Sequence, residues 1–377
     1  MKYGLLIIVL LTNILSAQDF KFAVMSDSRG RINGTNEPVL SMLANDLVTR
    51  HADTKFLIFA GDMVDGNRNA PEKTVFELDY WKKIMEPVYK SNMIFPKIWT
   101  TVGNHEIQHR YDQKNFVSAF PNVFMNGPDD EKGTTYFFDY DKCRFVILNT
   151  SRWYYGDPND STDDRRDWHY FKDLNWLERV LKEGRESKEI NHIFVFGHDM
   201  FFPTGGHLRD GFPFLGMDFK GTVDSTRQWY LNQSAKMWEL LKKYDVAAYI
   251  AGHEHLYSRQ SVDGIYQIVA GSAGAPIYYH NSKYGDNPEK KRPGQEMTYD
   301  EALPYYKILG YNIGPGGNAQ KSNDFVGLRA FHYLLLEVEE ERIVAKTYGV
   351  NVKEETQSEP ESNEIQLIDE FIIETGD

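Results

Sequence analysis

Short apolar runs that end in polar blocks recur along most of the chain. Their length and their content of Val, Ile and Phe are typical of buried β-strands. Such runs are residues 20–25, 56–60, 98–102, 190–196, 246–251 and 265–269. Apolar residues at helical spacing predict helices at 36–49, 76–89, 173–183 and 234–244. Strands that alternate with helices indicate an α/β protein.

The remaining regular elements are expected near the middle and the C-terminus. Paired strands are predicted at 135–140 with 144–149 and at 332–338 with 342–348, and a last strand at 367–373. Four stretches look like insertions: residues 149–170, 203–230, 277–326 and 353–364. Long loops in compact domains are often lids or binding walls, so this role and that of a solvated loop both stay open for the first three.

Composition places the chain among large globular proteins. It has 377 residues, of which 41% are apolar and 14% aromatic, enough for a large core. The net charge of −13 argues against a broad nucleic-acid-binding surface or an anionic membrane as partner, since both need basic protein surface. An anionic small molecule is not excluded, because bound metal ions would dominate the local field. We expect residues 18–377 to form a single domain.

The N-terminus is typical of an export signal. Lys2 precedes a mostly apolar stretch at 3–15, and small residues follow at Ser16 and Ala17, which predicts a signal peptide at 1–17. An uncleaved anchor stays open as the alternative, although the apolar stretch is short for a membrane span. After cleavage we expect no stable membrane span.

The chain contains a single cysteine, Cys143, within an apolar run. An intrachain disulfide is therefore impossible, and a buried strand position is the simplest interpretation. An exported protein without disulfides fits a bacterial periplasmic, cell-envelope or secreted location.

Five short polar blocks, each placed at the end of a predicted strand, carry the chemistry of the chain. They are SDSRG with Asp27, AGDMVD with Asp62, GNHE with Asn104 and His105, FGHD with His198, and GHEH with His253 and His255. Singly, each has a plain structural explanation, such as a helix cap, a turn or a partly buried histidine. Together, two carboxylates, one amide and several imidazoles suit a pair of metal ions that act on phosphate esters.

The order and spacing of these blocks resemble the calcineurin-like metallophosphoesterase superfamily, which includes the purple acid phosphatases. The resemblance covers roughly residues 20–348, and its last three blocks are the most specific. It implies a four-layer α/β/β/α sandwich in which two mixed sheets face each other between outer helices. It also implies a hydrolase of phosphate esters that uses a metal-activated hydroxide.

The resemblance further implies a role for each polar residue. Asp62 would bridge two metal ions, Asn104, His198 and His253 would complete one site, and Asp27 and His255 would hold the other. His105 would lie beside the phosphate as a hydrogen-bond donor or general acid, and Asp65 would accept a hydrogen bond behind the ligands. The donor set suits iron, manganese or zinc.

Arg29 departs from the family pattern. Much of the family has a histidine ligand two residues after the first aspartate, where this chain has Arg29, and a guanidinium cannot bind a metal. Purple acid phosphatases use a tyrosine after the second block, where this chain has Asp65. Three alternatives stay open: two metal ions with Arg29 gripping the phosphate, one metal ion with Arg29 supplying the missing charge, or Arg29 turned away toward an acidic neighbour.

We predict an exported phosphomonoesterase that acts on a small-molecule substrate. A phosphodiesterase acting on nucleotide or lipid-derived diesters, and a non-catalytic metal- or phosphate-binding relative, are the alternatives. His105 argues against the last, since a binding protein does not need an acid there. Other residues that could reach the site, most simply interpreted as packing or surface residues, are His109, Arg152, His207, Tyr278 and Tyr279.

Overall fold

The computed structural model describes most of the chain outside its N-terminus and the long insertions. The described residues are 19–67, 69–109, 111–151, 173–202, 204, 225–278, 325–353 and 355–375. The predicted signal peptide and most of the three longer insertions lie outside these residues. None of the helices within the described ranges is long and apolar enough to cross a membrane.

The first sheet has six strands, and the first three apolar runs of the chain form three of them. Its spatial order is β13 (Gln366–Glu374), β12 (Arg342–Asn351), β11 (Ala330–Val338), β1 (Phe20–Met25), β2 (Phe56–Ala60) and β3 (Ile98–Thr101). β1, β2 and β3 are parallel, whereas β11, β12 and β13 are antiparallel to their neighbours. The parallel strands therefore end at one edge, where their polar blocks meet.

The second sheet has seven strands and is also mixed. Its spatial order is β10 (Val326–Leu328), β8 (Tyr257–Val262), β9 (Ile265–Ala270), β7 (Ala248–Ala251), β6 (His192–Phe196), β5 (Cys143–Ile147) and β4 (Tyr136–Tyr140). β5, β6, β7 and β9 are parallel, and antiparallel strands flank them. Cys143 is buried at the start of β5, as predicted.

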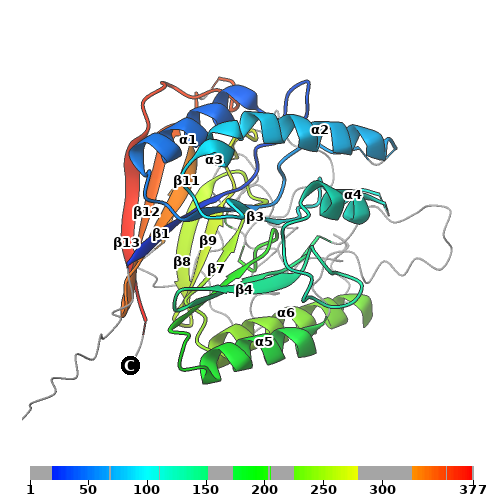
Figure 1. Ribbon diagram of the computed structural model, residues 1–377, viewed down its shortest axis with the longest axis vertical. Helices are drawn as coiled ribbons and strands as arrows, with labels where there is room; N and C mark the ends of the chain where they lie inside the picture. The colour runs from blue at the N-terminus through cyan, green and yellow to red at the C-terminus, as the bar shows by residue number, and fades with distance from the viewer. Residues whose placement is uncertain are drawn as a thin grey trace, which may run out of the picture.

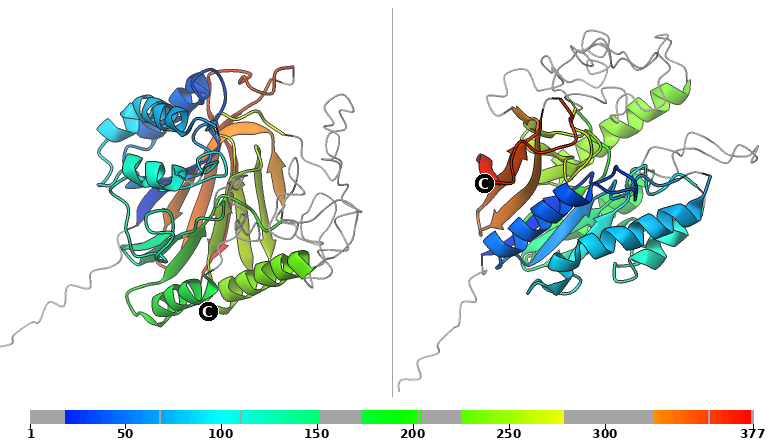
Figure 2. Two further views of the ribbon diagram at one scale, coloured as in Figure 1. Left: turned by 90° about the vertical axis from the view of Figure 1, so that its right-hand side faces the viewer. Right: turned by 90° about the horizontal axis from the view of Figure 1, so that it is seen from above.

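Helices cover the outer face of each sheet and complete four layers (Figures 1 and 2). On the six-stranded sheet lie α1 (Glu37–Arg50), α2 (Pro71–Ile84), α3 (Glu86–Lys90) and α4 (Asp112–Ala119). α5 (Leu174–Glu186) and α6 (Ser225–Lys243) lie on the seven-stranded sheet. The predicted four-layer sandwich of two mixed sheets is confirmed.

Aromatic rings fill the space between the two sheets. Phe22 of β1 meets Phe145 of β5 edge to face at 5.1 Å between ring centroids, and Phe56 of β2 meets the same ring at 5.3 Å. Such pairs add attraction beyond the burial of apolar area. This core fixes the two sheets against each other, and with them the strand ends that carry the polar blocks.

Several elements differ from those predicted by periodicity. The helix expected at 76–89 begins earlier, at Pro71, and is divided at Met85 into α2 and α3. The insertion predicted at 203–230 was placed too far along the chain at its C-terminal end, because α6 begins at Ser225. The short helix α4 and the strands β8 and β10 were not predicted at all.

Candidate metal centre

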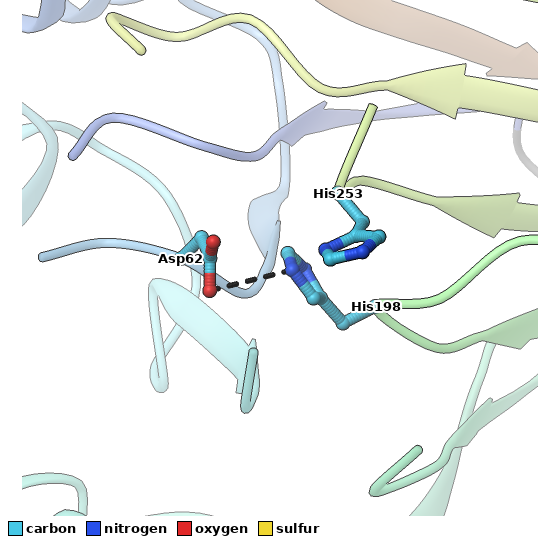
Figure 3. A group of neighbouring side chains, drawn as sticks. All are labelled: Asp62, His198 and His253. Carbon is cyan, nitrogen blue, oxygen red and sulfur yellow. Dashed lines mark ion pairs between the residues drawn. The ribbon is translucent and has the colours of Figure 1, made fainter. Parts of the chain in front are cut away.

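The polar blocks of both sheets meet in one place. Asp27 follows β1 and Asp62 follows β2, whereas His253 follows β7 in the other sheet. Direct bonds join the sheets here, since the His253 N–H donates to Asp27 Oδ2 at 3.0 Å. Figure 3 shows the Asp62 carboxylate facing the ring of His198, with His253 beside that ring. The ring centroids of the two histidines lie 5.1 Å apart.

Two groups of buried side chains have a geometry suited to metal ions. In the first group, the ligand atoms of Asp62, His198 and His253 lie within 4.8 Å of one another. The same holds for Asp27, Asp62 and His255 in the second. Asp62 belongs to both groups, so its carboxylate lies between the two sets of candidate ligands.

Hydrogen bonds to backbone carbonyls fix the tautomers of two of these histidines. Nδ1 of His198 lies 2.9 Å from the carbonyl oxygen of Ala60, and Nδ1 of His255 lies 2.9 Å from that of Pro276. A carbonyl oxygen only accepts, so Nδ1 carries the proton in both rings. Nε2 is then the nitrogen of each ring that faces the site, as in metal-binding histidines. Although burial acts in the opposite direction, the carboxylates of Asp62 and Asp27 raise the pKa of His198 well above its usual value, so a metal ion would displace a proton from its Nε2.

An orphaned acceptor gives an independent test of metal binding. Asn104, which follows β3, is buried, and its Oδ1 has no hydrogen-bond partner among the described residues. Leaving a buried amide oxygen unpaired is unfavourable, whereas a cation would satisfy it. Burial also raises the pKa of Asp27 to about 6, despite the opposing effect of His198. These residues therefore fit a group that brings positive charge.

The ligand loops adopt backbone conformations that their residue types seldom adopt. The φ angles of Asp27, Asp62 and His253 are 56°, 51° and 69°, in the left-handed region. A Cβ at Gly103 would lie 2.2 Å from Asp62 Oδ1, and one at Gly252 would lie 2.3 Å from Asp27 Oδ2. Strained residues of this kind cluster at functional sites, where the surrounding structure holds them in place.

A buried carboxylate behind the ligands, which the sequence did not reveal, holds these loops together. Glu106 accepts hydrogen bonds from the backbone amides of Asp62 at 2.7 Å, Gly103 at 2.8 Å and Val64 at 3.1 Å. It thereby ties the loop after β2 to the loop after β3. Its signal was present in the fourth letter of GNHE, which we interpreted only as part of the family pattern.

A second buried glutamate, in the loop after β7, also accepts a backbone hydrogen bond close to the centre. Glu254, between the two histidines of GHEH, accepts from the backbone amide of Thr204 at 2.7 Å. The hydroxyl of Thr150 accepts from the backbone amides of His198 at 3.0 Å and Asp199 at 3.1 Å. Polar groups around the centre thus orient the loops that carry the ligands.

His105 lies at the edge of the centre, with 24% of its side chain exposed. Its backbone N–H donates to Asp62 Oδ1 at 3.0 Å, and its Nε2 lies 4.0 Å from Asp62 Oδ2. Nδ1 donates to the backbone carbonyl of Asp65 at 2.6 Å. Asp65 accepts this bond from His105 with its main chain, which leaves its carboxylate for Arg29.

Arg29 points into the centre. Its Nε lies 3.5 Å from Asp62 Oδ2 and its Nη1 lies 3.6 Å from Asp65 Oδ1, and 21% of the side chain is exposed. Asp62 Oδ1, in contrast, faces Nε2 of His198 at 3.3 Å. Arg29 thus meets acidic neighbours, as the third alternative expected, but these neighbours are Asp62 and Asp65 of the centre and the side chain is not turned away from it.

Of the less specific candidates from the sequence, one contacts a candidate ligand, one packs elsewhere, and three lie outside the described residues. Tyr278 stacks on His255, with ring centroids 4.3 Å apart. His109 packs instead against Tyr111, at 4.9 Å between ring centroids. Three candidates lie outside the described residues: Arg152, His207 and Tyr279.

Solved structures share the fold at low sequence identity. The chain is similar to the purple acid phosphatase PPD1 from yellow lupin (Lupinus luteus), with 13% identity and a TM-score of 0.58 over 95% of this chain and 54% of that one. It therefore spans about half the length of the lupin enzyme.

The chain is also similar to two other solved structures, over almost the whole length of each. A dimetal phosphatase from Danio rerio gives 14% identity and a TM-score of 0.52, over 95% of this chain and 99% of that one. GAP50, described as the anchor in the inner membrane complex of Plasmodium, gives 15% identity and 0.51, over 95% and 90%. No curated protein matches the sequence.

The match to a family model is more direct than these likenesses. The model described as calcineurin-like phosphoesterase matches residues 20–257, more than half of the chain. The matched segment contains all five polar blocks and every residue of the two ligand groups. The predicted family is confirmed, and its description agrees with the predicted class of enzyme, a hydrolase that acts on phosphate ester bonds. The chain belongs to the calcineurin-like phosphoesterase family.

Proposed function

We propose that the protein is a metal-dependent phosphatase that hydrolyses small phosphomonoesters. The observation that carries this proposal is the pair of buried ligand groups that share Asp62. Arg29 and His105 lie beside the shared carboxylate, so both would face a phosphate bound at the metal ions. No other cluster of candidate metal ligands occurs in the described part of the chain.

Six side chains would hold the metal ions. Asp62 would bind both, with Asn104, His198 and His253 on one side and Asp27 and His255 on the other. Bound iron, manganese or zinc would supply the Lewis acidity that polarises a phosphate and acidifies water at neutral pH. The backbone carbonyls that bind Nδ1 of His198 and of His255 leave Nε2 as the nitrogen of each ring that would bind a metal.

The chain's own groups would act on the phosphate and on the leaving group. Arg29 can donate two parallel hydrogen bonds to phosphate oxygens, which both binds and orients the ester. His105 carries a proton on Nδ1, held by the Asp65 carbonyl, so Nε2 is the atom left to face the substrate. Burial lowers the pKa of His105 to about 4. The imidazolium form, whose Nε2 proton could go to the departing oxygen, would therefore have to be stabilised by the negative charge of the bound phosphate.

The guanidinium of Arg29 supports a monoester as the substrate. A phosphomonoester has three oxygens that carry no leaving group, enough for contacts with Arg29 and with both metal ions at once. A diester has only two such oxygens and less negative charge. We expect the manganese-loaded protein to hydrolyse p-nitrophenyl phosphate faster than bis(p-nitrophenyl) phosphate. Faster hydrolysis of the diester would support the phosphodiesterase alternative instead.

Variants of two central residues test whether the protein is an enzyme at all. Asp62→Asn removes the shared carboxylate charge, and His105→Ala removes the proposed proton donor without touching a ligand side chain. Both should lose hydrolysis of p-nitrophenyl phosphate. If neither ester is hydrolysed by the metal-loaded protein, or if both variants match its rate, a non-catalytic relative is the better description.

We also propose, from the N-terminal sequence alone, that the protein is exported and loses residues 1–17. Lys2 and the apolar stretch 3–15 support this. The mass of the protein recovered from expressing bacterial cells would test it, since the mature form should begin at Gln18 and leave the cytoplasm. Recovery of the intact chain in the cytoplasm would reject export.

A further inference from the structure

The segment just beyond the matched family region encloses one side of His255. Nδ1 of His255 donates to the carbonyl of Pro276 at 2.9 Å, and the backbone N–H of Tyr278 donates to the carbonyl of His255 at 2.8 Å. The Tyr278 ring stacks on the His255 ring, with 4.3 Å between centroids and 11° between planes. The position, tautomer and plane of this imidazole are all set by residues 276–278.

Tyr278 is itself firmly placed. Nε of Arg329 donates to the Tyr278 carbonyl at 3.0 Å, and the backbone amide of Ile277 donates to Gln357 at 2.7 Å. The Tyr278 side chain is partly buried and packs against the core of the seven-stranded sheet. A tyrosine held in this way can restrict the groups that touch it.

We propose that Tyr278 is a positioning residue for the Asp27 side of the centre. Its ring holds His255 in the plane that directs Nε2 toward Asp27, 3.5 Å away. The proposal rests on the proposed metal centre but not on the proposed hydrolysis of phosphomonoesters. It revises our interpretation of Tyr278 as a packing residue.

Two substitutions test the role of the ring. Tyr278→Phe keeps the ring and removes the hydroxyl, and Tyr278→Leu removes the ring. Calorimetric titration of the metal-free full chain with Mn²⁺ should show affinity unchanged in the Phe variant and weakened about tenfold in the Leu variant, as for other groups that orient a metal ligand.

A matched control distinguishes this role from loss of a ring packed on any histidine. Tyr348 is also partly buried, and its ring lies 4.6 Å from that of His51, the residue that follows α1. Tyr348→Leu should therefore leave the Mn²⁺ affinity at the wild-type value.

Two outcomes would overturn the proposal. Wild-type Mn²⁺ affinity in a folded Tyr278→Leu rejects the stacking role, and so does an equal loss of affinity in Tyr348→Leu. If Tyr278→Leu does not fold, Tyr278→Met, which also lacks the ring, is measured in its place. A wild-type protein that binds Mn²⁺ but hydrolyses nothing rejects the phosphatase function alone, while the comparison of Mn²⁺ affinities still tests the role of the ring.

Discussion

The two sides of the shared carboxylate are built differently. On the first side, Asp62 Oδ1 faces Nε2 of His198 at 3.3 Å. A ring nitrogen of His253 lies within 4.8 Å of the ligand atoms of both residues. The family pattern adds Asn104 to this side. On the second, Asp62 Oδ2 faces the Arg29 guanidinium at 3.5 Å. We call these the histidine side and the arginine side. The arginine side also holds Asp27 and His255.

This difference shows that the guanidinium of an arginine can occupy part of a site that would otherwise hold a metal ion. A guanidinium near the bridging carboxylate satisfies negative charge that a metal ion would otherwise satisfy, and it repels that ion. We therefore expect a metal ion on the arginine side to bind more weakly than one on the histidine side. Arg29 in turn offers a bound phosphate two hydrogen-bond donors in a fixed geometry.

The largest effect is expected from Asp62→Asn, because Asp62 serves both sides. The variant should lower kcat/KM for p-nitrophenyl phosphate by about a thousandfold or more, since several kcal/mol of metal-dependent stabilisation are lost. Its Mn²⁺ affinity should fall on both sides in a calorimetric titration. Asp46→Asn, a substitution at a carboxylate on α1, serves as the control. A rate within tenfold of wild type would show that the two sides do not depend on this carboxylate.

The two histidines of GHEH compare the sides within one loop. His253→Ala should remove the tightly bound Mn²⁺, whereas His255→Ala should remove the weakly bound one and leave the tight one in place. Each should slow hydrolysis by about a hundredfold, as loss of a group that stabilises the transition-state charge commonly does. Equal losses of tight binding in both variants would contradict unequal sides.

Replacing Arg29 with histidine should make the two sides more alike. Arg29→His adds an imidazole ligand and removes the repelling charge, so affinity for the weaker Mn²⁺ should rise about tenfold or more. KM for the monoester should rise, because the bidentate grip is lost. Arg29→Lys keeps the charge without the fork of donors, so it should raise KM but leave metal affinity unchanged. Identical behaviour of the two variants would reject the charge argument.

The smallest effect is expected behind the ligands, at Glu106. In Glu106→Gln the amide NH₂ must face at least one of the backbone amides that now donate to the carboxylate. This should lower the free energy of unfolding by about 1–3 kcal/mol in urea denaturation. Mn²⁺ affinity should fall together with it, whereas Glu340→Gln on an exposed turn should change neither.

The sequence predicted the ligands better than the groups that hold them. Asp62 and His253 follow apolar strands, and a polar block after an apolar run is visible locally. Glu106 and Tyr278 act through contacts that only the tertiary structure creates, the first with three backbone amides and the second with a ring 23 residues earlier, at His255. No pattern of hydrophobic and polar positions marks such contacts.

The fold was predictable wherever burial follows apolar composition. β1 and β2 are apolar and buried, and they were predicted at their observed positions. β8 was missed because its buried residues include Arg259 and Gln260. Arg259 donates to Asp369 of β13 at 2.6 Å, and Gln260 donates to the carbonyl of Phe202 at 3.0 Å. Partners from distant segments make burial of these polar groups acceptable, and the sequence does not show those partners.

The most direct test of unequal sides is a calorimetric titration of the metal-free wild-type protein with Mn²⁺, read beside Arg29→His. The account predicts two phases in the wild type, one tight equivalent followed by a weaker one, and two tight equivalents in Arg29→His. Two equally tight equivalents in the wild type, or an unchanged titration after the substitution, would contradict it.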